Sequence, residues 1–179
     1  MRLRPGELEF VLGQGLPAVV EIRGPSMTPT LAVGERLDVQ PAPAPAGAAA
    51  GDDVAVGDIV LVRSADAAEL LTHRVMHLFT EQGRRFVVHQ GDRPGASFAI
   101  CTREAVIGKA VGFASDPARP LPTVARMSAR DRARFQRRAA AAAVYCRARG
   151  AARALRLHDS KLTRAAARLY RRLTGALAR

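Results

Sequence analysis

Short apolar segments, separated by turns rich in glycine and proline, make up most of the chain between residues 17 and 113. Their high content of valine, isoleucine and leucine is typical of β-strands. We expect strands at 17–23, 36–40, 59–63, 70–79, 85–90 and 105–113. One short helix is expected at 5–14, ending at Gly15, because glycine fits the left-handed conformation at a helix end. The pattern therefore predicts a mainly β body.

The composition changes sharply after Pro122. Residues 1–122 carry 12 Lys and Arg against 14 Asp and Glu, a net charge of −2, whereas residues 123–179 carry 16 against 2, a net charge of +14. The second part is rich in Ala, Arg and Leu, which favour helices, and glycine at position 150 is expected to break it. We therefore expect a β domain over 1–122, with a flexible Pro/Ala loop at 41–53, followed by a basic helical tail over 123–179.

Several protein classes are disfavoured by what the chain lacks. No stretch approaches the ~18 consecutive apolar residues of a membrane-spanning helix, and the N-terminus lacks the apolar core of a secretory signal. Two cysteines, Cys101 and Cys146, do not form a disulfide framework. His77, His89 and His158 lack metal-ligand spacing, so we expect no metal and no cofactor. A cytoplasmic location is the resulting expectation.

A serine occupies a predicted tight turn, in the sequence Gly-Pro-Ser-Met at 24–27. A sharp turn can expose the hydroxyl of Ser26, and a nearby histidine can take its proton and make it a nucleophile. His73 is the candidate base, because no lysine precedes Lys109 in the chain. Each residue alone also fits a structural role, since Pro-Ser turns are common and a lone histidine is more often structural than catalytic.

Five short motifs set these two residues in a wider pattern. They are Gly24-x-Ser26-Met27-x-Pro29, Gly57-Asp58-Ile59-Val60, His73-Arg74-Val75, Gly91-Asp92 and Val106-Ile107-Gly108-Lys109. In this order they resemble the signal peptidase/LexA superfamily of serine peptidases, over about residues 16–113. The His-Arg-Val motif resembles the branch that uses histidine, not lysine, as general base. The resemblance implies a coiled, partly closed β-sheet with the Ser/His site at its edge.

The resemblance also assigns roles to individual residues. Ser26 would be the nucleophile, His73 the general base, and Met27 would lie beside the substrate cleft. Asp92 would be the carboxylate that orients His73. The histidine branch usually has a second Asp shortly after Gly-Asp, whereas residues 93–98 contain no acid. Three alternatives stay open at this point: Asp92 substitutes, catalysis uses a Ser/His dyad, or the enzyme is weakened.

The expected function is that of a serine endopeptidase that removes leader- or signal-type peptides, bound in extended form along the sheet edge. The alternative is a catalytically weak or inactive peptide-binding module on the same fold. A self-cleaving DNA-binding regulator is disfavoured, because the segment before Ser26 is too short for a helix-turn-helix. For the tail we expect packing on the body and peripheral contact with an anionic membrane. Nucleic acid ranks lower, because no DNA-reading motif is present.

Overall fold

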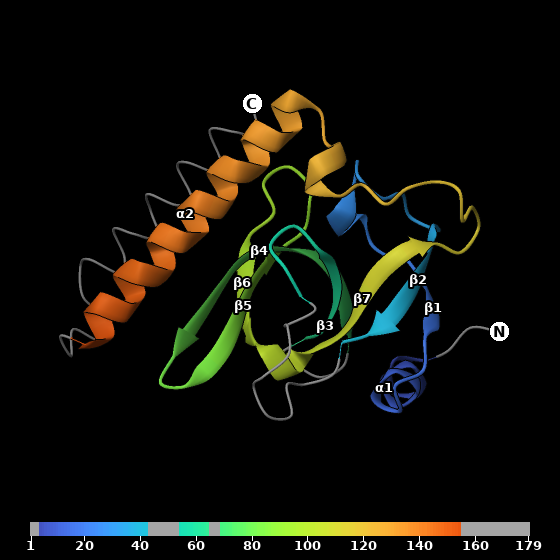
Figure 1. Ribbon diagram of the computed structural model, residues 1–179, viewed down its shortest axis with the longest axis horizontal. Helices are drawn as coiled ribbons and strands as arrows, with labels where there is room; N and C mark the ends of the chain where they lie inside the picture. Colours follow the sequence, from blue (N-terminus) through green and yellow to red (C-terminus); the bar gives the residue numbers. More distant parts are fainter. Residues whose placement is uncertain (1–3, 43–53, 65–68, 155–179) are drawn as a thin grey trace.

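The computed structural model describes residues 4–42, 54–64 and 69–154 (Figure 1). The strands are β1 Ala18–Glu21, β2 Arg36–Pro41, β3 Ile59–Arg63, β4 Leu70–Glu81, β5 Arg84–Gln90, β6 Phe98–Thr102 and β7 Val106–Phe113. The helices are α1 Pro5–Gly13 and α2 Ala129–Ala154, with short 3-10 turns η1 Pro25–Met27, η2 Arg103–Ala105 and η3 Val124–Arg126.

All seven strands join one sheet, in the order β1-β2-β7-β3-β4-β5-β6. Every neighbouring pair is antiparallel. The sheet is open, because the edge strands β1 and β6 are not hydrogen-bonded to each other. The expectation of a mainly β protein with a C-terminal helical appendage is thus confirmed.

Two apolar clusters occupy the two faces of the central strands, because successive side chains of a strand point to opposite sides. Ile59 and Leu61 of β3 belong to a cluster that α1 covers with Leu8 and Leu12. The alternate residues of β3, Val60 and Val62, belong to a second cluster with valines of β4, β5 and β7. Neighbouring positions on one strand therefore face different surroundings.

Helix α2 packs against the sheet at the end away from α1, alongside β4, β5 and β6 (Figure 1). Phe135, Ala142 and Cys146 of the helix are buried with Met76 of β4 and Val88 of β5. The first turn begins after Ser128, whose Oγ accepts a hydrogen bond from the Asp131 amide at 3.1 Å, as an N-cap does. The first part of the basic tail therefore shares a core with the β body.

Three sequence-based expectations need correction. The expected break at Gly150 is wrong, because α2 continues through it to Ala154; a single glycine costs a helix only about 1 kcal/mol relative to alanine. Strand β6 lies outside the expected strands, and Pro41, the first residue of the expected loop at 41–53, still pairs with Gly108 in β2. The rest of the expected loop at 41–53, and the part of the expected basic helical tail after residue 154, lie outside the described residues.

No helix in the described ranges combines the length and the apolar character needed to cross a membrane. The expected contact of the tail with an anionic membrane, the lower-ranked contact with nucleic acid and the cytoplasmic location are not tested by the fold and stay predictions. The division at residues 122 and 123 likewise stays a prediction.

The shared core predicts that Phe135→Ala destabilises the β body as well as the helix. Phe135 is 9% exposed, and truncating a buried phenylalanine costs about 3 kcal/mol. Urea denaturation should show this loss as a lower midpoint in a single transition, followed by circular dichroism at helix and strand wavelengths. The exposed Arg137→Ala should change the unfolding free energy by less than about 0.5 kcal/mol. A separate early transition of the helix alone would contradict the shared core.

Candidate active site

Ser26 lies at the centre of the short turn η1, which follows β1 across the linker 22–24. The turn is fixed by the bond from the Thr28 amide to the Pro25 carbonyl, at 3.1 Å. It is also anchored by Met27, whose fully buried side chain packs in the core with Leu31 and Leu37. In contrast to Met27, the Ser26 side chain is only half-buried, and it lies at the edge of a groove.

The main chain of Ser26 is packed tightly against residues 91–93. The Arg93 amide donates a hydrogen bond to the Ser26 carbonyl at 2.9 Å. A Cβ atom built on Gly91 would lie 2.4 Å from the Ser26 carbonyl oxygen and 3.2 Å from the Ser26 Cβ. Only a glycine permits so close an approach. Glycine at position 91 is therefore a requirement for the present placement of Ser26.

His73 projects from β4 on the side opposite to Thr72, the preceding residue, which lines the groove. Its Nδ1 lies 2.9 Å from Nδ1 of His89 on β5, and the two ring centroids are 5.1 Å apart. His89 is only 3% exposed. The hydrogen bond fixes one ring nitrogen of His73 and leaves Nε2 for another partner.

The strand register brings the backbone of Ser26 near the position of His73, although Thr72 and not His73 lines the groove. Arg74 pairs with Gln90, so the ladder, continued by one residue, would place Gly91 opposite His73. The absent side chain of Gly91 would point to the side from which His73 projects, and that space holds the Ser26 Cβ. Turn η1 accordingly packs against β4. Within the described ranges, no hydrogen bond yet joins Ser26 Oγ to the His73 ring.

Asp92 binds Arg74 instead of forming a hydrogen bond with His73. Arg74 Nε donates to both carboxylate oxygens, at 3.0 and 3.1 Å, and Nη2 donates at 2.7 Å. Arg74 is fully buried, and its Nη1 also donates to the Gly57 carbonyl at 2.8 Å. The role of Asp92 as the acid that orients His73 stays a prediction, whereas its role as the partner of a buried arginine is seen directly.

Both histidines are biased towards the neutral form. Burial lowers the pKa of His73, and the negative charge of Asp92 partly raises that pKa again. Burial, and to a lesser degree the charge of His73 when it is protonated, lower the pKa of His89 to about 4. At neutral pH both rings therefore favour the uncharged form.

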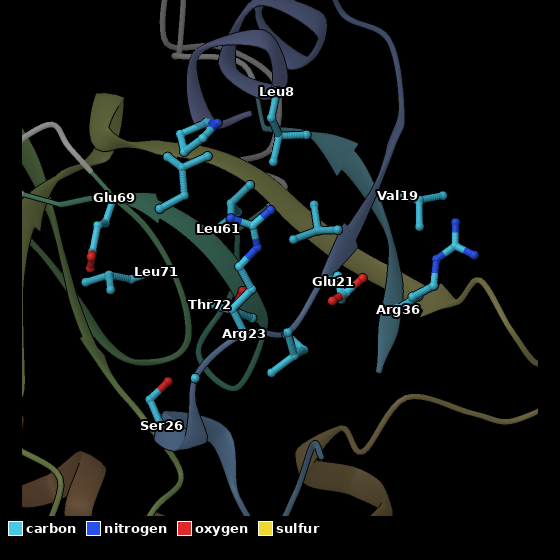
Figure 2. Close-up of a pocket in the computed structure, with 15 residues that line it drawn as sticks. Leu8, Val19, Glu21, Arg23, Ser26, Arg36, Leu61, Glu69, Leu71 and Thr72 are labelled. Carbon is cyan, nitrogen blue, oxygen red and sulfur yellow. The ribbon is translucent and has the colours of Figure 1, made fainter. Parts of the chain in front are cut away.

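The groove beside Ser26 runs between two strand edges and has a volume of about 630 Å³ (Figure 2). One wall is the run 19–24, in and after β1, which is an edge strand of the sheet and pairs with β2. The other is the run 69–72 in β4, ahead of Arg74, where the pairing with β5 begins. In Figure 2 the Ser26 side chain points into the pocket at one end. Met27, predicted to lie beside the cleft, is in the core, and it is not among the residues that line this groove.

One lysine shares the face of His73. Val60 of β3 pairs with His73 on one side and with Lys109 on the other, so the three form one row. The ammonium of Lys109 lies 3.0 Å from the Asp58 carboxylate. An ion-paired lysine is a poor general base, so the geometry favours His73 in this role.

No family model matches the chain, and neither the curated proteins nor the solved structures gave a match. The superfamily resemblance therefore rests on the five motifs. Among the residues described, no three His, Cys, Asp or Glu side chains are grouped so as to hold a metal ion.

The close contact at Gly91 predicts that Gly91→Ala displaces Ser26. The added Cβ would meet the Ser26 carbonyl, so the turn must move. A misplacement of about 1 Å in a reacting group can cost about 100-fold in rate, and we expect a loss of that order in peptide cleavage. Gly112→Ala is the matched control, because its Cβ would meet nothing closer than 3.7 Å. Full activity of Gly91→Ala would show that the contact does not position the serine.

Proposed function

We propose that the protein is a serine endopeptidase in which Ser26 is the nucleophile and His73 the general base. One observation carries this proposal. Ser26 stands at the end of a groove between the runs 19–24 and 69–72, and its Cβ lies against Gly91, the position that follows the Arg74–Gln90 pair towards His73. His73 itself is not among the residues that line the groove, so the proposal requires its ring to reach Ser26 from beside the groove.

The proposed reaction begins when a peptide carbonyl lies against Ser26. His73 Nε2 takes the hydroxyl proton as Ser26 Oγ forms a bond to the carbonyl carbon. The resulting oxyanion accepts a hydrogen bond from the Ser26 amide, which donates to no other group in the described part of the chain. The carbon–nitrogen bond then breaks, and His73 returns the proton to the leaving amine.

Water completes the cycle by attacking the acyl ester. His73 takes a proton from the water as its oxygen bonds to the carbonyl carbon, and the ester bond to Ser26 Oγ breaks. The proton passes to Ser26, the new carboxyl-terminal peptide leaves, and the free enzyme is restored. Each step uses one histidine that alternates between base and acid, which requires a pKa below or near the working pH.

The proposed substrate is a peptide in extended conformation. Strand edges at 19–24 and 69–72 offer backbone donors and acceptors on both sides of the groove, so a substrate segment would add as a strand between them. The resemblance favours leader- or signal-type peptides with small side chains near the scissile bond. Specificity would then arise from alternate side chains that point into the groove.

Incubation with a peptide library, followed by mass spectrometry, tests the proposal. We expect products that share a cleavage rule, appear with the wild-type protein and are absent with Ser26→Ala. The same products from both preparations would identify a contaminating peptidase. No cleavage by either protein, at any pH between 5 and 9, would reject the endopeptidase.

A second candidate is a peptide-binding module without catalysis. In the described part of the chain no hydrogen bond joins Ser26 to His73, which favours this candidate, while the groove serves binding equally well. Equilibrium binding of library peptides to the protein without any product formation would support this candidate over the peptidase.

A further inference from the structure

The proposed function gives no role to the hydrogen bond between the side chains of His73 and His89. The two Nδ1 atoms lie 2.9 Å apart, on neighbouring strands of the sheet. At that distance one Nδ1 must carry the proton and the other must accept it. Two protonated Nδ1 atoms would repel each other, and two bare ones could not bond. The pair therefore has two alternative arrangements.

Only one arrangement leaves His73 able to act as a base. If His73 donates from Nδ1, its Nε2 bears a lone pair and can accept the Ser26 proton. If His89 donates, His73 carries its own proton on Nε2. Nε2 then has no lone pair with which to accept the proton of Ser26. The orienting partner of a catalytic histidine must therefore accept its Nδ1–H bond, as a carboxylate does in serine-peptidase triads.

We propose that His89 is the positioning residue of the site: it accepts the Nδ1–H bond of His73 and holds Nε2 as the free nitrogen on the side of Ser26. This inference rests on the proposed function. His89 takes the place that was predicted for Asp92, whose carboxylate binds Arg74. An acceptor that stays neutral at working pH also suits this role, and burial lowers the pKa of His89 to about 4.

The charged groups around the pair do not supply another acceptor for His73. Asp92 on the loop after β5 is bound to Arg74 of β4, and Lys109 of β7 is bound to Asp58. From α2, Arg138 donates to the Gln90 side chain and to the Gly91 carbonyl, at 3.0 and 2.8 Å. Among these groups, only the carboxylate of Asp92 affects the pKa of His73: its negative charge raises that pKa without a hydrogen bond to the ring.

Three substitutions at position 89 test the acceptor. Asn places an amide oxygen where Nδ1 stands, so His89→Asn should keep kcat within about 10-fold of wild type. Leu has the same shape without an acceptor, so His89→Leu should lower kcat by about 100-fold or more at unchanged KM, because His89 does not line the groove. His89→Asp adds a negative charge beside His73 and should move the acid limb of the kcat/KM profile to higher pH.

His77→Asn provides the matched control, since His77 is a half-buried histidine of β4 that stacks on Phe79 and makes no contact with the pair in the described part of the chain. Circular dichroism and urea midpoints establish that each variant folds. Equal kcat for His89→Asn and His89→Leu, both folded, would overturn the inference, because a purely structural histidine does not distinguish acceptor from apolar isostere.

A measurement on the wild-type protein separates this inference from the peptidase itself. Two-bond nitrogen–proton NMR spectra at neutral pH assign the proton-bearing nitrogen of each histidine. We expect the proton on Nδ1 of His73 and on Nε2 of His89. The reverse assignment overturns the inference whether or not the protein cleaves peptides. The expected tautomers in a protein that cleaves nothing would leave the pair as inferred and reject the proposed function alone.

Discussion

Ser26→Ala and His73→Ala are each expected to lower kcat/KM for peptide cleavage by at least about 1,000-fold, without loss of the fold. The first removes the only atom that forms the acyl bond. The second removes the group that takes the hydroxyl proton, and an unactivated serine is a weak nucleophile at neutral pH. Neither side chain is fully buried, so truncation leaves no large cavity.

The kinetics need a histidine control from the same strand. His77→Ala is suitable, because His77 stacks on Phe79 with the ring centroids 6.2 Å apart, away from Ser26. We expect near wild-type kcat/KM for this variant. The double variant of Ser26 and His73 should be no slower than either single variant, since residues that act as one unit lose their effect together. Wild-type rates in either single variant would reject the assigned roles.

Asp92→Asn is expected to lower the free energy of unfolding by about 3–5 kcal/mol. Arg74 is fully buried, and the Asp92 side chain is 10% exposed and 2.7 Å from the nearest guanidinium nitrogen. An amide in place of the carboxylate leaves the buried positive charge without its counter-charge. Urea denaturation measures the loss. Replacing both partners by apolar residues should recover part of it, because no uncompensated charge then remains.

A partly exposed pair provides the comparison for Asp92. Glu9 accepts from Arg63 at 2.7 Å, but the two side chains are 25% and 41% exposed, so Glu9→Gln should cost less than about 1 kcal/mol. An Asp92→Asn variant as stable as wild type, with a strongly lowered kcat, would return Asp92 to the role of triad acid. A large loss of stability fits the Arg74 pair, and in either case the acid limb of the pH–rate profile should move to lower pH, because the charge of Asp92 raises the pKa of His73.

Most strands could be predicted because each is a short apolar run between turn residues. The hairpin at Gln82 and Gly83 is an example: both residues adopt positive φ, at 51° and 73°, as a tight hairpin turn requires. β6 escaped prediction because its sequence, Phe-Ala-Ile-Cys-Thr, follows a loop without strong apolar alternation, and it is held by pairing with β5. Long-range pairing of this kind is not visible in local sequence.

The candidate site was predictable only in part. Ser26 and His73 are candidates that their motifs suggest, but no motif suggests the hydrogen-bond partner of His73. A β-bulge in β4 between Val75 and His77 shifts the register, so His89 pairs with Val75 and lies diagonally across from His73. Without the bulge, counting back from the hairpin turn would place a different residue there. The arginine partner of Asp92 was equally hidden, since it depends on the same register.

Labelling with an acylating or phosphonylating serine-peptidase reagent tests the central claim most directly. Intact-mass spectrometry should show one adduct per chain on the wild-type protein, and peptide mapping should place it on Ser26. His73→Ala should be labelled at least about 100-fold more slowly, Ser26→Ala not at all, and His77→Ala at the wild-type rate. An adduct on another residue, or labelling of Ser26 at an unchanged rate without His73, would contradict a Ser26 nucleophile activated by His73.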